Sequence, residues 1–142
     1  MKPKTIKELK KIMIENCYNN ALYSIDGNFI YEGCGVDKSG ELYIWFYTER
    51  GNRENLKYFR TEEEVAAYAF DIISNDKHAK SHLIAMTQNP DYSKEVISKL
   101  ELRGLQYWFD EIPQFNENSL IRIFVLGCDI NKAQDLITYK GF

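Results

Sequence analysis

The stretch from Gly40 to Ile73, GELYIWFYTERGNRENLKYFRTEEEVAAYAFDII, constrains the fold more than any other part of the chain. Residues 41–49 are predicted to form a β-strand, in which successive side chains point to opposite faces. A turn at Arg50-Gly51-Asn52 leads into a returning strand. The first strand is apolar on both faces: Leu42, Ile44 and Phe46 point one way, and Tyr43, Trp45 and Tyr47 the other. A small one-layer sheet does not require this pattern, so the strand is either core or an aromatic surface.

Capping patterns predict where the helices begin. Thr5 with Glu8, and Thr61 with Glu64, have the spacing of a capping box. Asn89 precedes a proline that suits the first position of a helix. A final helix is expected from about residue 131. Apolar residues follow each of these starts at helical intervals, so the helices are amphipathic.

These elements predict one α+β domain over residues 1–142, with an antiparallel sheet and helices packed mainly on one face. Residues 22–59 read as a four-stranded antiparallel meander, with a tight hairpin at Asp26-Gly27-Asn28. The apolar stripe of the second helix continues to about Thr87. Residues 105–109 and 120–126 read as strands around a loop at Pro113–Ser119. The segment Asn89–Ser93 is the best candidate for a subdomain boundary.

Charge and hydropathy limit the partners. The net charge of −3 argues mildly against a nucleic-acid binder, because such proteins normally carry a basic excess. The N-terminal residues lack the apolar region of a secretory signal, and no segment approaches the roughly 18 apolar residues of a membrane span. The sequence therefore predicts a cytoplasmic protein with no membrane association, and no motif predicts a cofactor or a metal ion.

An enzymatic alternative depends on two histidines. His78 and His82 lie four residues apart, which on a helix would place both on one face and could hold a metal ion or serve a hydrolase. However, the glutamate of an HExxH motif does not follow His78, and no third ligand is indicated. Solvated surface histidines are the better interpretation.

A nucleic-acid-binding alternative depends on aromatic residues with cations beside them. Tyr43, Trp45 and Tyr47 could form a stacking platform, and four cations lie nearby in the sequence: Arg50, Arg53, Lys57 and Arg60. Glu49, Glu54 and the glutamates that follow offset this positive charge, which argues against nucleic acid as the partner. Core packing is the simpler interpretation of the aromatic residues.

Residues 101–119 are acidic, with Glu101, Asp110, Glu111 and Glu117 set against Arg103 alone. The expected loop at Pro113–Ser119 would expose part of this charge. A solvated loop explains the composition, and a contact surface for a basic partner is the alternative.

The segment IWFYTERGNRENLKYFRTEEEVAAYAFDII resembles a pattern seen in small bacterial immunity proteins of polymorphic-toxin and contact-dependent-inhibition systems. The resemblance rests on a strand that carries Trp45 and ends in Glu49-Arg50-Gly51, a short strand that ends in Phe59, and a helix with an acidic start and alanines. Thr48 departs from the pattern, which has an aromatic or small residue there. The resemblance covers about residues 20–75.

The resemblance implies a non-enzymatic cytoplasmic protein that binds the C-terminal domain of a cognate toxin and blocks it. Such toxins are often nucleases with basic grooves, which an acidic surface would complement. The expected contacts are Glu49, Arg50, Asp110, Glu111 and Glu117. Trp45 and Trp108 are candidate anchors if they are exposed, because tryptophan often dominates interface energy.

Overall fold

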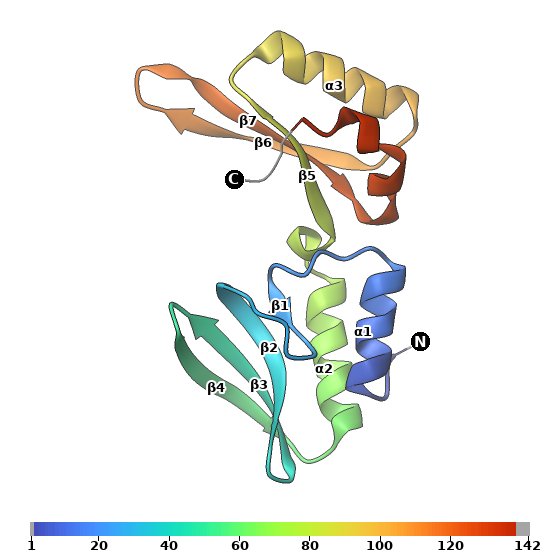
Figure 1. Cartoon of the computed structure of the whole chain (residues 1–142), viewed down its shortest axis with the longest axis vertical. Helices are drawn as coiled ribbons and strands as arrows, with labels where there is room; N and C mark the ends of the chain where they lie inside the picture. Colours follow the sequence, from blue (N-terminus) through green and yellow to red (C-terminus); the bar gives the residue numbers. More distant parts are fainter. Residues whose placement is uncertain (1, 139–142) are drawn as a thin grey trace. The chain divides into compact units, whose positions relative to one another are not determined.

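The computed structural model describes residues 2–138 and has an α+β fold (Figure 1). The elements in chain order are α1 (Ile6–Glu15), β1 (Tyr23–Ser24), β2 (Glu32–Ser39), β3 (Leu42–Glu49), β4 (Asn52–Phe59), α2 (Glu62–Ser74), the 3₁₀ turn η1 (Lys77–Lys80), β5 (Ser81–Thr87), α3 (Pro90–Leu102), β6 (Tyr107–Gln114), β7 (Glu117–Leu126), and the 3₁₀ turns η2 (Gly127–Lys132) and η3 (Gln134–Leu136). The chain forms two compact units that divide between Ala79 and Lys80. This division differs from the single domain, with a possible boundary at Asn89–Ser93, that the sequence predicted.

The first unit contains a four-stranded sheet in the order β1-β2-β3-β4. Strands β2, β3 and β4 form the predicted antiparallel meander, but β1 pairs with β2 in parallel, Tyr23 opposite Cys34. The predicted hairpin at Asp26-Gly27-Asn28 is therefore wrong. The Asn28 side chain accepts from the Ile25 amide at 3.0 Å and donates to the Tyr23 carbonyl at 2.9 Å, which holds the chain in a wider loop.

Two glycines in β2 allow β1 to approach. A β-carbon at Gly35 would lie 2.4 Å from the Ser24 carbonyl oxygen and 2.6 Å from the Phe46 ring. One at Gly33 would lie 2.1 Å from the Leu22 carbonyl oxygen. Both glycines therefore mark a close approach of the β1 and β2 backbones.

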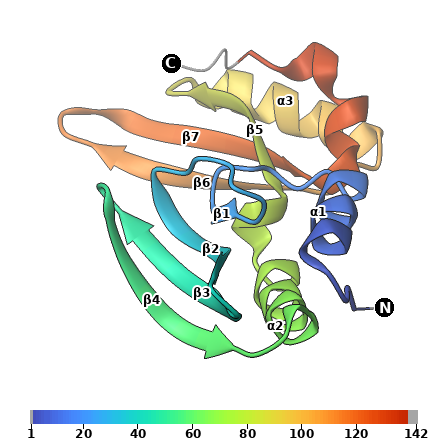
Figure 2. The ribbon, with the colours of Figure 1, turned by 60° about the horizontal axis from the view of Figure 1, so that its bottom comes forward.

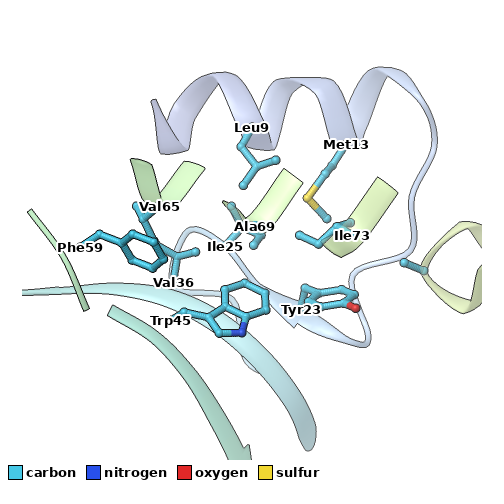
Figure 3. Packing of buried hydrophobic residues seen from close by; sticks show 11 residues of the cluster. Leu9, Met13, Tyr23, Ile25, Val36, Trp45, Phe59, Val65, Ala69 and Ile73 are labelled. Carbon is cyan, nitrogen blue, oxygen red and sulfur yellow. The ribbon is translucent and has the colours of Figure 1, made fainter. Parts of the chain in front are cut away.

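Helices α1 and α2 lie side by side on one face of this sheet (Figure 2). Thr5 and Thr61 cap them as predicted, accepting from the Glu8 and Glu64 amides at 3.0 and 3.2 Å. The Glu62 carboxylate also accepts from the Ile6 amide at 3.0 Å, so one glutamate serves the start of both helices. The core between helices and sheet is shown in Figure 3 and contains Leu9, Met13, Tyr23, Trp45, Phe59, Val65, Ala69 and Ile73.

The second unit contains an antiparallel sheet in the order β5-β7-β6, with α3 on one face (Figure 1). The Asn89 side chain caps α3 as predicted, accepting from the Asp91 amide at 3.0 Å. The core beneath α3 is aliphatic and contains Ile84, Ala85, Val96, Leu100, Leu105, Ile121, Ile123, Val125, Ala133 and Leu136. Residues 2–138 therefore form two sheets, where the sequence predicted one.

Three boundaries in this region differ from the sequence prediction. Residues 81–87 form β5 and not the end of a helix, because they pair with β7. Strand β6 ends at Gln114 and strand β7 begins at Glu117, so a tight hairpin replaces the predicted loop at Pro113–Ser119. The expected final helix is replaced by η2 and η3.

Candidate functional site

The turn between β3 and β4 brings together charged side chains that the sequence had singled out. Arg50 and Gly51 both have positive φ, 51° and 81°, as the two central residues of a type I′ turn require. A surface hollow of about 370 Å³ at this turn is lined by Tyr47, Glu49, Arg50, Asn52, Arg53 and Glu54. The predicted contacts Glu49 and Arg50 therefore lie next to each other on an exposed edge.

Three carboxylates share one face of the sheet at this edge. Glu32 is paired with Glu49 across β2 and β3, and Glu54 is paired with Tyr47 across β3 and β4. Paired residues of antiparallel strands project to the same side, so these glutamates flank the Tyr47 side chain. We call Glu32, Tyr47, Glu49 and Glu54 the acidic edge.

The Tyr47 hydroxyl links two of these carboxylates. It donates to Glu32 at 2.8 Å and lies 3.3 Å from a Glu49 oxygen. The hydrogen bond to Glu32, with the nearby negative charge, raises the pKa of Tyr47 to about 12. The folded protein therefore holds this phenol protonated beyond the pH at which an ordinary tyrosine ionises.

The cations near the acidic edge are used in different ways. Arg50 is exposed and makes no ion pair among residues 2–138. Arg53 pairs with Asp37 at 2.9 Å, and its guanidinium lies 3.8 Å from the centre of the Phe46 ring. Arg50 is therefore the more available of the two for an external partner.

The basic residues do not form a single stripe for nucleic acid. Arg53 is paired with Thr48 and Lys57 with Trp45, and these two β3 residues point to opposite faces. The Lys57 ammonium also lies 4.7 Å from the centre of the Tyr68 ring. Two of the four cations behind the nucleic-acid alternative thus face opposite sides of the sheet.

Trp45 is a core residue, which removes it as an interface anchor. Its side chain is only 3% exposed, and its ring centre lies 6.1 Å from that of Tyr23 (Figure 3). The Tyr68 ring centre lies 5.7 Å away. The prediction that it anchors a partner depended on exposure, and its burial makes that prediction wrong. The two helices on this face of the sheet enclose it.

Trp108 and Asp110 have partners within the second sheet. The half-buried Trp108 indole stacks on Phe124 with ring centres 4.3 Å apart, and its N–H donates to the Ser81 hydroxyl at 2.7 Å. Asp110 accepts two hydrogen bonds from the Arg122 guanidinium, one of them at 2.9 Å. These interactions give both residues a structural role, which weakens their prediction as partner contacts.

Glu111 and Glu117 are exposed on the β6–β7 hairpin, whose tip extends beyond the N-terminal start of α3 (Figure 2). Glu117 accepts from the Gln88 amide at 2.8 Å. Phe115, at the tip between them, is 91% exposed. The hairpin therefore presents the predicted carboxylates together with an apolar side chain.

The two histidines of the enzymatic alternative do not lie on one α-helix. His78 lies in η1 and His82 in β5, so the four-residue spacing does not place them on one helical face. Within residues 2–138, no group of three or more His, Cys, Asp or Glu side chains is arranged to hold a metal ion.

One surface feature could not be predicted from the sequence. Phe29 and Tyr31, in the loop before β2, are 77% and 85% exposed and pack edge to face with ring centres 5.0 Å apart. Both residues lie within residues 22–59, where the sequence predicted a continuous strand meander. The preceding Asp26-Gly27-Asn28 was the available signal that this segment is a loop.

Comparison with protein-family models, curated proteins and solved structures finds no match to this chain. No helix among residues 2–138 has the length and apolar character needed to span a membrane.

Proposed function

We propose that this chain is an immunity protein that binds the C-terminal domain of a cognate bacterial toxin in the cytoplasm and neutralises it without catalysis. The observation that carries the proposal is the resemblance of the segment from Ile44 to Ile73 to such proteins. In the structure this segment is a strand, a Glu49-Arg50-Gly51 turn, a second strand and a capped helix with an acidic start.

The distribution of exposed charge supports a basic partner. The acidic edge carries three carboxylates on one face, and Glu111 and Glu117 are exposed on the second unit's hairpin. A nuclease toxin has a positively charged groove for its substrate, and complementary carboxylates accelerate capture and favour the correct partner. The proposal therefore names a nuclease domain as the toxin class.

Growth rescue tests this proposal. The C-terminal domain of the protein encoded immediately upstream is expressed with and without this chain. We expect the domain alone to stop growth, and co-expression to restore growth with a stoichiometric complex on a sizing column. A toxic domain that this chain neither rescues nor binds would overturn the pairing.

A charge reversal with a matched control tests the electrostatic part. Glu49→Lys at the end of β3 is compared with Glu41→Lys just before its start, because both residues are exposed and undergo the same charge change. We expect Glu49→Lys to lower the association rate constant with the upstream toxin domain about tenfold at low salt. Glu41→Lys should leave that rate constant within about twofold of the wild-type value. Equal effects of the two substitutions would show that only net charge matters.

A further inference from the structure

Strand β4 forms one edge of the first sheet (Figure 1). Within residues 2–138, only β3 pairs with it, and no strand lies on its outer side. Every residue of β4 except Phe59 is exposed, including the apolar Leu56 and the aromatic Tyr58. The outward amide and carbonyl groups of an edge strand are a template for pairing with another chain. Strand β4 is therefore a candidate surface for strand pairing.

A β-bulge places two opposite charges of β4 on one face of the sheet. Glu54 is paired with Tyr47 on β3. Lys57 is paired with Trp45, and the register shifts next to this pair, where Leu56 is the extra residue. Residues three apart on a regular strand point to opposite faces, but the two β3 partners are two apart and share a face. Glu54 and Lys57 therefore project from the same face.

The order of these two charges makes β4 complementary to a second copy of itself. In a symmetric antiparallel pair of strands, placing Glu54 opposite Lys57 of the second copy also places Lys57 opposite Glu54 of that copy. The two-fold axis is then perpendicular to the sheet, so corresponding faces of the two copies lie on the same side. Opposite charges directly across two strands stabilise their pairing. Neither Glu54 nor Lys57 has an ion-pair partner among residues 2–138.

The same register also matches the other face of the strand. Arg53 is paired with Thr48, and Tyr58 is paired with Ile44. Because these two β3 partners lie on the face opposite Trp45, Arg53 and Tyr58 do so as well. One step outward from the charged pair, Arg53 lies opposite Tyr58 of the second copy, where a guanidinium is attracted to an aromatic ring.

We propose that this chain forms a symmetric dimer in which the β4 strands of two copies pair antiparallel, with Glu54 opposite Lys57 of the second copy. The edge strand β6 of the second sheet offers no such match, because it contains two carboxylates, Asp110 and Glu111, and no cation. The inference goes beyond the proposed function and does not rest on it, since its tests use this chain alone.

Sedimentation equilibrium and hydrogen exchange test the dimer with the wild-type chain. A single pair of edge strands is a small interface, so we expect a dimer dissociation constant of about 10–100 μM. Amide exchange in residues 52–59 should slow when the protein concentration rises through this range. A chain that stays monomeric to about 1 mM, or a dimer whose added protection lies outside β4, would overturn the inference.

Two charge-reversed variants test the register. Glu54→Lys sets lysine against lysine at both symmetric positions, and Lys57→Glu sets glutamate against glutamate. Each variant alone should dimerise at least about tenfold more weakly than the wild-type chain. An equimolar mixture of the two restores both opposite-charge pairs, so its heterodimer should form within about threefold of the wild-type affinity. A mixture that associates no better than the separate variants would contradict this register.

A matched control separates this register from net charge. Glu41 is exposed and lies outside β4, so Glu41→Lys gives the same charge change as Glu54→Lys and should leave dimerisation within about twofold of wild type. Mixed with Lys57→Glu, it leaves one pair of facing glutamates, and this heterodimer should form at least about threefold more weakly than the one with Glu54→Lys. Equal heterodimer affinities in the two mixtures would show that net charge alone drives association, and the inference would fail.

Discussion

Trp45 and Trp108 lie on similar strands and have different surroundings. Each lies in a run of aromatic and apolar residues, IWFY in β3 and YWF in β6. Trp45 faces the two helices of the first unit and is buried between them, whereas Trp108 is on the sheet face opposite α3 and is covered by Phe124 stacking. A strand pattern fixes which side a residue takes, and the helices decide which side becomes core.

The largest expected effect tests this difference directly. Trp45→Ala should lower the free energy of unfolding of the first unit by about 3–5 kcal/mol, because it empties the centre of a packed core. Trp108→Ala should cost the second unit about 1–2 kcal/mol, since it removes one stacked pair and one hydrogen bond from a half-buried site. Native-state hydrogen exchange measures each unit separately.

A matched control checks that these losses arise from packing. Trp45→Phe keeps an aromatic ring in the core and should recover a substantial part of the Trp45→Ala loss. If Trp108→Ala lowers the free energy of unfolding as much as Trp45→Ala does, the two tryptophans are equally well packed, and cover by helices does not explain the difference in their burial.

A smaller loss of stability is expected when the ion-paired arginine of either sheet is replaced. Arg122 pairs with Asp110 beside Phe124, and Arg53 pairs with Asp37 above Phe46. Arg122→Ala should lower the free energy of unfolding by about 2 kcal/mol, and Arg53→Ala by about 1 kcal/mol, because Asp37 is 51% exposed and Asp110 only 31%. Denaturant unfolding at low and high salt measures both losses.

Salt distinguishes the two pairs further. The Arg53 loss should shrink at high salt, because exposed ion pairs are screened, while the Arg122 loss should change less. Equal salt sensitivity would show that the second sheet holds its ion pair no more tightly than the first.

The smallest expected effect concerns two tyrosines that donate to glutamates. Hydrogen bonding to Glu32 raises the pKa of Tyr47 to about 12 from its usual 10.0. Hydrogen bonding to Glu101 at 2.6 Å raises the pKa of Tyr107 as well. In each case the hydrogen bond favours the protonated phenol in the folded state, so the bond contributes its full stabilisation below pH 10. For Tyr47 this stabilisation is lost as the pH rises through about 12.

Spectroscopic titration measures this effect. Tyr47→Phe should remove one phenol that ionises near pH 12 from the absorbance titration of the folded protein, and Glu32→Gln should move that transition toward 10.0. A wild-type Tyr47 that titrates at its usual pKa would mean that the Glu32 hydrogen bond does not persist in solution.

The starts of the helices were predictable because their signals are local. Thr5, Thr61 and Asn89 each cap a helix where the sequence indicated one. Residues 81–87 were misassigned because strand β5 is stabilised by pairing with β7, about 40 residues away in sequence. Long-range pairing leaves no capping signal, and an apolar stripe alone does not distinguish helix from strand.

Only part of the candidate site could be predicted from the sequence. Glu49 and Arg50 were singled out, and both are exposed at the turn. Glu32 and Glu54 were not, because they join Glu49 only through the pairing of three strands. Phe29 and Tyr31 were missed because exposed and buried aromatic residues look the same in sequence.

The sequence by itself determined the α+β class and the helix starts, because capping and strand alternation act over a few residues. Only the tertiary structure decided that the chain has two units, that Trp45 is core, and that three carboxylates share one face. These outcomes depend on which segments pair and which faces the helices cover, and contacts between residues distant in sequence set both.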